Sequence, residues 1–278
     1  MSHFENYQHV SRSYDNTRTA VGVEKILKQL ENGELPINQQ LLVDAGCGTG
    51  LYSATLVKYV RNIEAIDLNA GMLNIAKNKM KLEGKNGLIN FYLASIDSLP
   101  LEDNNADAVM INQVLHHLPD NSTRGWSHHE KVFREFWRVL KSGGMLIINS
   151  CSPEQIESGF WFYHLIPEAM QKIKQKVINL SDLNNLLKDC GFSNTVQEVN
   201  MDLVLQSDAY FYADGIFNAD WRSGDSIWSL VPKEILSKVL IKADKTHKAE
   251  KLEAYLKLHD QKRKTTGQVT FSISRKIP

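Results

Sequence analysis

The sequence predicts an α/β fold in which helices cover both faces of a mostly parallel sheet. Short apolar runs alternate with helical patterns along the first two-thirds of the chain. The first run stops at Asp44 beside a glycine cluster, and the second stops at Asp67. Strands that alternate with helices favour a parallel sheet. We therefore expect a doubly wound, Rossmann-like sheet of seven strands.

The strands are placed by apolar runs and the helices by apolar residues at helical spacing. The expected strands cover residues 41–43, 63–66, 88–94, 106–111, 145–148, about 195–205 and 268–274. The expected helices cover residues 51–60, 70–80 with Asn69 as N-cap, 130–140 and 181–190. We expect the third helix to stop at Gly143-Gly144, because glycine commonly follows a helix C-terminus.

Two segments rich in aromatic residues interrupt this alternation, and they divide the predicted single domain. Residues 1–150 form an N-terminal cover and the ligand-binding core, and residues 151–180 form a lid insertion. Residues 181–205 return to the core, residues 206–266 form a second insertion, and residues 267–278 form the last core strand.

The composition excludes several classes of protein. Lys+Arg and Asp+Glu are equal at 32 each, so the chain has no global attraction to nucleic acid or anionic membranes. No apolar run approaches the ~20 residues that span a bilayer, and no apolar leader precedes the core. The three cysteines form no C-x-x-C pair, which argues against disulfides and structural zinc and favours a cytoplasmic location.

The glycine-rich turn after the first strand predicts a nucleotide-like ligand. Gly46, Gly48 and Gly50 read G-x-G-x-G, whereas a dinucleotide fingerprint needs a glycine where Leu51 stands. The acidic Asp44 before the turn fits a cationic ligand better than a pyrophosphate. Asp67 ends the second strand and can accept both hydroxyls of a ribose; the alternative is a solvated turn aspartate.

The spaced motifs resemble those of class I S-adenosylmethionine-dependent methyltransferases of the small-molecule type, with a core similar to that of ubiquinone/menaquinone methyltransferases. Residues 42–50 resemble the first motif of that family, and residues 64–72 resemble its ribose-binding strand end. Residues 94–97 resemble its adenine loop, and residues 105–119 resemble its fourth strand with the segment that follows. The resemblance covers about residues 40–150 and implies S-adenosylmethionine as donor and S-adenosylhomocysteine as product.

The resemblance also implies roles for individual residues. Gly46, Cys47, Gly48 and Gly50 pack against the methionine part of the donor, with Asp44 near its ammonium group. Asp67 holds the ribose, and Leu68 and Ile96 enclose the adenine. Asp97 binds the adenine amino group, and Asn112 or Gln113 lies at the sulfonium end. The remaining predicted contacts to the donor are Met72, Ser95 and Tyr14.

Methyl transfer from a sulfonium needs alignment and desolvation more than a particular catalytic residue. His116 and His117 follow the fourth strand and are candidates for a general base; the alternative is a structural filler of the turn. His128-His129 lacks the spacing and the carboxylates of a metal site, so we predict no metal.

The acceptor is expected to be a small molecule held by the aromatic insertions. The candidate substrate-binding residues are Trp161, Tyr163, His164, Tyr210, Trp221 and Trp228. The alternative for each is ordinary packing inside the lid. Tyr7 and Tyr14 belong to an N-terminal segment that either covers the donor or packs as a helix.

Other functions remain open from the sequence. They are a methyltransferase that acts on RNA or protein, a non-catalytic module that binds the donor, and a nicotinamide dehydrogenase, which Leu51 disfavours. The acceptor, the methylated atom and the oligomeric state are not predicted.

Overall fold

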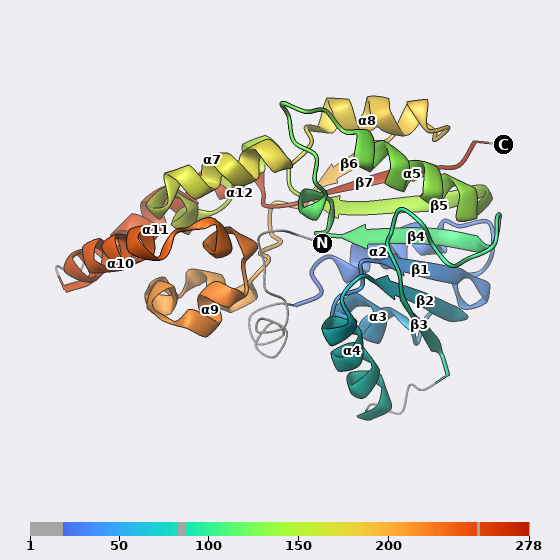
Figure 1. Ribbon diagram of the computed structural model, residues 1–278, viewed down its shortest axis with the longest axis horizontal. Helices are drawn as coiled ribbons and strands as arrows, with labels where there is room; N and C mark the ends of the chain where they lie inside the picture. The colour runs from blue at the N-terminus through green and yellow to red at the C-terminus, as the bar shows by residue number, and fades with distance from the viewer. Residues whose placement is uncertain (1–18, 83–86, 249–250, 278) are drawn as a thin grey trace.

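The computed structural model describes residues 19–82, 87–248 and 251–277, and within them seven strands form one sheet (Figure 1). The strand order is β3-β2-β1-β4-β5-β7-β6, in which β7 runs antiparallel to both of its neighbours and the other pairs are parallel. The strands are β1 (Leu41–Ala45), β2 (Asn62–Asp67), β3 (Ile89–Leu93), β4 (Ala106–Asn112), β5 (Leu140–Ser150), β6 (Val196–Val199) and β7 (Thr270–Arg275). The predicted α/β fold is confirmed.

Helices cover both faces of the sheet because successive strand residues point to opposite sides. Leu42 and Ile63 pack on the face covered by α2 (Val23–Glu31), α3 (Leu51–Leu56) and α4 (Ala70–Leu82). Val43 and Ile66 pack on the opposite face, against α5 (Ser127–Val139) and α8 (Leu180–Asp189). Both faces of the central strands are therefore buried, which explains their continuous apolar runs.

The register brings the carboxyl ends of the parallel strands to one edge of the sheet. Ala45 of β1 pairs with Ile66 of β2, and Asp67 pairs with Leu93 of β3. Asn112 ends β4 beside Asn149 of β5. The turns that follow these strands therefore meet at the same edge, where ligands bind in open α/β sheets.

The two interrupting segments pack together into one helical region that extends beyond this edge (Figure 1). The first segment contains α6 (Pro153–Ser158), η4 (Trp161–Leu165) and α7 (Pro167–Lys176). The second contains η5 (Ser207–Phe211), η6 (Ala213–Phe217), α9 (Ala219–Ser223), η7 (Ser226–Leu230), α10 (Lys233–Lys248), α11 (Leu252–Asp260) and α12 (Arg263–Thr266). Contacts of α11 with η4 and of α7 with η7 join the segments. Two short 3₁₀ turns, η2 (Ile37–Gln39) and η3 (Leu115–His117), belong to the part of the chain that forms the sheet.

Several boundaries differ from the prediction: α3 ends at Leu56, four residues early, and β5 begins at Leu140, five residues early. The third predicted helix ends at Val139, and Gly143-Gly144 lie within β5, so they do not stop the helix. Gly143 has a φ of 74° and lies in the irregular first half of the strand, where the pairing with β4 shifts register. The sixth strand is shorter than predicted, since only Val196–Val199 pairs with β7. Among the described residues, no helix is long and apolar enough to cross a bilayer.

Candidate functional site

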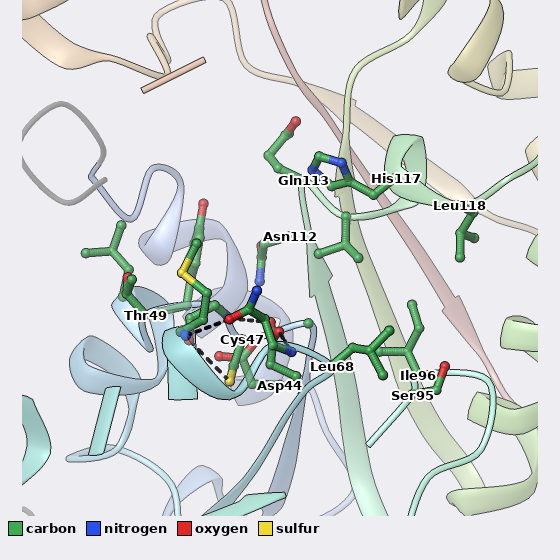
Figure 2. Close-up of a pocket in the computed structure, with 18 of the residues that line it drawn as sticks. Asp44, Cys47, Thr49, Leu68, Ser95, Ile96, Asn112, Gln113, His117 and Leu118 are labelled. Carbon is green, nitrogen blue, oxygen red and sulfur yellow. Dashed lines mark hydrogen bonds between the residues drawn. The ribbon is translucent and has the colours of Figure 1, made fainter. Parts of the chain in front are cut away.

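A cavity of about 220 Å³ lies at the carboxyl ends of β1, β2 and β4 (Figure 2). Its walls combine the glycine turn, the ends of β2 and β4, the loop after β3 and the turn after β4. The lining residues are Thr19, Asp44, Gly46, Cys47, Gly48, Thr49, Leu51, Tyr52, Asp67, Leu68, Asn69, Met72, Ser95, Ile96, Asn112, Gln113, Val114, His117, Leu118 and Leu205. Most predicted donor contacts therefore face one space.

The glycine turn forms one side of the cavity. Its backbone adopts conformations that favour glycine. Gly46 has a φ of 77°, and a Cβ added there would lie 2.6 Å from Val114 Cγ2. Gly48 has a φ of 55°, with open space where a Cβ would stand. Gly50 does not line the cavity; it precedes α3, and a Cβ there would meet Ala76 at 3.1 Å. Gly46 and Gly48 let a ligand approach the backbone, and Gly50 lets α3 pack on α4.

Asp67 connects the glycine turn to the end of β2. The Gly48 N–H donates to its Oδ2 at 2.8 Å, and the Asn69 N–H donates to its Oδ1 at 2.7 Å. Burial raises the pKa of Asp67, and these backbone hydrogen bonds oppose the rise. Each oxygen has a further lone pair, so the carboxylate can accept from a ligand hydroxyl while it holds the turn.

Asp44 is the most deeply buried acid of the cavity. The Ser53 hydroxyl donates to its Oδ2 at 2.6 Å. Burial raises the pKa of Asp44 to about 7, the nearby charge of Asp67 adds to the rise, and the Ser53 hydrogen bond opposes it. A buried carboxylate that is costly to ionise is well suited to a ligand that brings a positive charge.

Asn112, at the end of β4, points into the cavity (Figure 2). Both polar atoms of its side-chain amide are buried, and neither has a hydrogen-bond partner among the described residues. Buried amide groups are normally paired, because an unmade hydrogen bond costs about 1–3 kcal/mol. The orphaned donor and acceptor fit a ligand that offers both an acceptor and a donor, such as an amino-acid group.

Gln113 follows with a φ of 54°, in the left-handed region that is uncommon for residues other than glycine. Its side-chain Nε2 donates to Asn149 Oδ1 at 3.0 Å. Asn149 Nδ2 in turn donates to the Tyr52 hydroxyl at 3.2 Å, and that hydroxyl donates to the Val21 carbonyl at 3.0 Å. This chain of hydrogen bonds ties β4, β5, α3 and the segment before α2 together along one wall.

The opposite wall is more apolar. Leu68, Met72 and Ile96 line it with Ser95 (Figure 2), and Leu68 is 42% exposed. Asp97 does not line the cavity. Its carboxylate pairs with Lys131 Nζ of α5 at 2.8 Å, and this hydrogen bond lowers the pKa of Asp97. The predicted contact of Asp97 with the adenine stays a prediction, since its side chain pairs with Lys131 beside the lining.

The two candidate bases differ in position. His117 lines the cavity and points into it (Figure 2), whereas His116 is not part of the lining. The two rings lie 4.0 Å apart between centroids, and His116 Nε2 lies 3.5 Å from Ser226 Oγ in the helical region. The geometry therefore favours His117 as the residue that can reach a ligand.

The predicted substrate-binding aromatic residues do not line this cavity, and their contact with an acceptor stays a prediction. Five of the six are buried in the helical region: Trp161, Tyr163, Tyr210, Trp221 and Trp228. They pack on one another and on Phe162, whose ring centroid lies 5.0–6.2 Å from those of Tyr163, Tyr210, Trp221 and Trp228. His164 lies on the side of α11, with its ring 4.5 Å from that of His259. The buried aromatic residues belong to the core of the helical region, together with aliphatic residues of both insertions.

Three residues that line the cavity were not predicted from the sequence to do so: Thr19, Tyr52 and Leu205. Tyr52 sits one turn into α3, where its spacing from the glycines gives a weak signal. Thr19 and Leu205 reach the cavity only through folding, and Thr19 Oγ1 lies 2.8 Å from Ser207 Oγ of η5. Tyr7 and Tyr14 lie outside the described residues.

The second histidine pair is engaged by one carboxylate. Asp120 Oδ1 and Oδ2 lie 2.8 Å from the Nδ1 atoms of His128 and His129, respectively. No group of three or more potential metal ligands occurs within the described ranges. The pair therefore belongs to the N-terminus of α5.

Comparison with known proteins shows which family and which relatives this chain resembles. The family described as a methyltransferase domain matches residues 43–148. The ubiquinone/menaquinone biosynthesis C-methyltransferase of Vibrio parahaemolyticus is 25% identical over 217 residues, which cover 69% of this chain and 80% of that protein. The same enzyme of Vibrio cholerae is 27% identical over 180 residues, which cover 60% of this chain and 65% of that protein.

Solved structures share the fold. A putative methyltransferase from an antibiotic biosynthesis pathway of Anabaena variabilis has a TM-score of 0.68 at 18% identity, and the match covers 90% of this chain and 96% of that chain. Phosphoethanolamine N-methyltransferase 2 of Haemonchus contortus, in complex with S-adenosyl-L-methionine, has a TM-score of 0.63 at 15% identity. That match covers all of this chain and 61% of the other.

The fold is a Rossmann-like α/β sheet with a glycine-turn cavity at the carboxyl ends of its parallel strands. The matching family places a methyltransferase domain at residues 43–148, and together with the sequence relatives it supports a class I S-adenosylmethionine-dependent methyltransferase.

Proposed function

We propose that the cavity binds S-adenosylmethionine and that the enzyme transfers its methyl group to a small-molecule acceptor held in the same space. The observation that carries the proposal is the buried Asn112 amide, which points into the cavity with neither polar atom partnered among the described residues. The amino-acid group of the donor supplies a carboxylate acceptor and an ammonium donor for such an amide.

The residues of the cavity fit the rest of the donor. Gly46 and Gly48 let the methionine part approach the backbone, beside Cys47, and Asp44 neutralises the ammonium group. Asp67 accepts from the ribose hydroxyls. The adenine lies between apolar side chains, and these are Leu68, Met72 and Ile96, with Ser95 at the rim.

The donor supplies an electrophilic methyl group on a sulfonium when it is bound. The chain therefore has to align the acceptor, exclude water and, where the acceptor carries a proton, remove it. His117 is the candidate base, since it lines the cavity beside Gln113. The His116 ring packs against the His117 ring, with 4.0 Å between their centroids, and so helps to hold it in place.

A small acceptor is supported by the shape of the site and by the sequence relatives. Tyr52, Thr19, Leu118 and Leu205 complete the walls, and Leu205 lies directly before the second insertion. We infer that the helical region covers the acceptor as a lid whose aromatic cluster gives it rigidity. The Vibrio relatives are named for methylation of carbon in quinone biosynthesis, which favours a cyclic acceptor of similar chemistry.

The experiment is incubation of the enzyme and cell extract with methyl-labelled S-adenosylmethionine, followed by separation of small molecules from macromolecules. The proposal predicts label in the small-molecule fraction, and Asn112→Ala is expected to reduce it strongly. Label that accumulates only in RNA or protein contradicts the acceptor class. Asn112→Ala is a clean variant because it breaks no hydrogen bond within the described part of the protein.

A further inference from the structure

The turn between β4 and α5 supplies four of the twenty residues that line the cavity, and it is held from the side that faces away from the cavity. Gln113, Val114, His117 and Leu118 line the cavity, and Asp120, two residues further on, does not. Within the turn, the His117 N–H donates to Val114 O at 2.9 Å and the Leu118 N–H donates to Leu115 O at 3.1 Å. These local bonds close the 3₁₀ turn but do not set its position over the cavity.

At the start of the turn the Gln113 N–H donates to the Asn149 carbonyl at 2.8 Å, and at its other end Asp120 supplies a second connection. Its Oδ2 accepts the backbone N–H groups of His128 at 2.8 Å and of His129 at 2.9 Å. The two imidazole Nδ1 atoms each lie 2.8 Å from one of its oxygens. The carboxylate therefore receives four hydrogen bonds from one helix end, and its side chain is 5% exposed.

These bonds replace an ordinary helix cap. The N-cap residue of α5, Trp126, makes no side-chain capping bond, so the first N–H groups of the helix need another acceptor. An acidic side chain at a helix N-terminus also interacts favourably with the helix dipole. Asp120 fills both roles from eight residues upstream of His128, so capping α5 also fixes the turn.

The charge on Asp120 is secured by its surroundings. Burial alone raises the pKa of Asp120, but the hydrogen bonds from His129 and His128 outweigh it and hold the pKa below its usual value. Burial lowers the pKa of His129, against the opposing effect of Asp120, which favours a neutral ring that donates from Nδ1. The Asp120 side chain is thus a carboxylate that accepts four hydrogen bonds from the N-terminus of α5.

The helical region holds the same turn at a second point. Lys176, the last residue of α7, donates from Nζ to the Leu118 carbonyl at 2.7 Å. The Ser122 N–H donates to the Gln175 carbonyl at 2.8 Å. Burial lowers the pKa of Lys176, and the charge of Asp120 opposes that shift. The Asp120 carboxylate and the Lys176 ammonium group both hold the β4–α5 turn.

We propose that Asp120 is a positioning residue for the methyl-donor site: by capping α5 it fixes the β4–α5 turn and so holds Leu118 and His117 in the cavity wall. The inference rests on the proposed function, since it assigns a consequence for donor binding. Lys176 performs the same role from the helical region.

The test is the affinity for S-adenosylhomocysteine, measured by calorimetry, for the wild type and for Asp120→Ala, Asp120→Asn and Lys176→Met. Asp120→Ala is expected to raise Kd about tenfold or more, because both the cap and the charge are lost. Asp120→Asn keeps one acceptor oxygen for the backbone N–H groups and is expected to restore most of the affinity. Lys176→Met is expected to raise Kd in the same direction.

Asn179→Ala is the matched control. Asn179 caps the neighbouring helix α8 by accepting the Asp182 N–H at 2.8 Å, and it is not one of the residues that line the cavity. The control loses a cap of the same kind, so it reports the effect of lost stability alone, and its Kd is expected to stay within about twofold.

The outcomes separate the two proposals. A wild type that does not bind S-adenosylhomocysteine removes the proposed function. A wild type that binds it, with Asp120→Ala and Lys176→Met equally tight, removes the positioning role. If Asp120→Ala fails to fold, Lys176→Met decides: unchanged affinity in that variant overturns the inference. An equal loss in Asn179→Ala also overturns it, because general destabilisation then explains the effect.

Discussion

Ionisation of Asp44 is expected to make donor binding depend on pH near neutrality. Burial raises the pKa of this carboxyl from 3.8 to about 7, and the charge of Asp67 adds to the rise. A ligand that brings a positive charge beside Asp44 binds its ionised form. Below the pKa, binding must therefore first remove a proton, and the affinity falls.

The magnitude follows from the pKa of about 7. The ionised fraction is about one in eleven at about pH 6 and about ten in eleven at about pH 8. The affinity for S-adenosylhomocysteine should therefore be about tenfold weaker at the lower pH, a difference of about 1.4 kcal/mol.

Without ligand, the effect on stability has the opposite sign. The folded pKa of Asp44 lies above its unfolded value of 3.8, so the folded state binds the proton more tightly. This group therefore lowers the free energy of unfolding as the pH rises from 3.8 to about 7, and adds no further change above that range. A ligand cation reverses this loss.

The assay is calorimetric titration with S-adenosylhomocysteine at about pH 6, 7 and 8, in buffers matched for ionic strength. Asp44→Asn should bind more weakly at the highest pH and show a flat profile. Ser53→Ala removes the 2.6 Å hydrogen bond that favours the ionised form, so it should move the midpoint to higher pH. A wild-type Kd that does not change across this range refutes the reasoning, as does the same pH dependence in Asp44→Asn.

Three further predictions follow from the geometry. Gly46→Ala should destabilise the protein by about 1–3 kcal/mol in urea unfolding, because its φ is 77° and the new Cβ meets Val114 at 2.6 Å; unchanged stability contradicts the assigned backbone. Tyr210→Phe removes the 2.8 Å hydrogen bond to Asp260 and should cost about 1–3 kcal/mol of stability while S-adenosylhomocysteine affinity stays unchanged; a weakened affinity contradicts its placement in the lid core. If His117 is the base, His117→Ala should lower kcat by about 10²–10⁴-fold with little change in donor affinity, and full turnover excludes the role.

The position of the site could be predicted because parallel strands share one carboxyl edge. Gly46, Asp67, Ile96 and Asn112 follow four different strands, and that rule alone places them together before any contact is known. The structure brings all four into one cavity. Motifs at the ends of single strands were therefore enough to predict which residues share the site, because the parallel topology brings those strand ends together.

The acceptor side could not be predicted in the same way. Trp161 and Tyr210 look equally suited to a pocket and to a core, and the difference depends on which segments pack on them. The two insertions bury each other's aromatic faces, and the Trp161 indole N–H donates to the Tyr210 carbonyl at 2.9 Å. Asp97 shows the same limit, since its partner Lys131 lies 34 residues away on α5.

Asp120 illustrates a different gap. In the sequence it is one acidic residue of a polar turn, and His128-His129 draws attention as a metal candidate. Only the three-dimensional arrangement shows that one carboxylate takes both imidazoles and two backbone N–H groups. A cap supplied from eight residues upstream lies outside the local patterns that identify helix starts.

The most direct test of the central claim is a crystal structure of the enzyme with S-adenosylhomocysteine. We predict that the ligand lies in the cavity at the ends of β1, β2 and β4, with the ribose hydroxyls on Asp67, the amino-acid group on Asn112 and Asp44, and the adenine beside Ile96. A ligand bound elsewhere, or bound here with the Asn112 amide still unpaired, contradicts it.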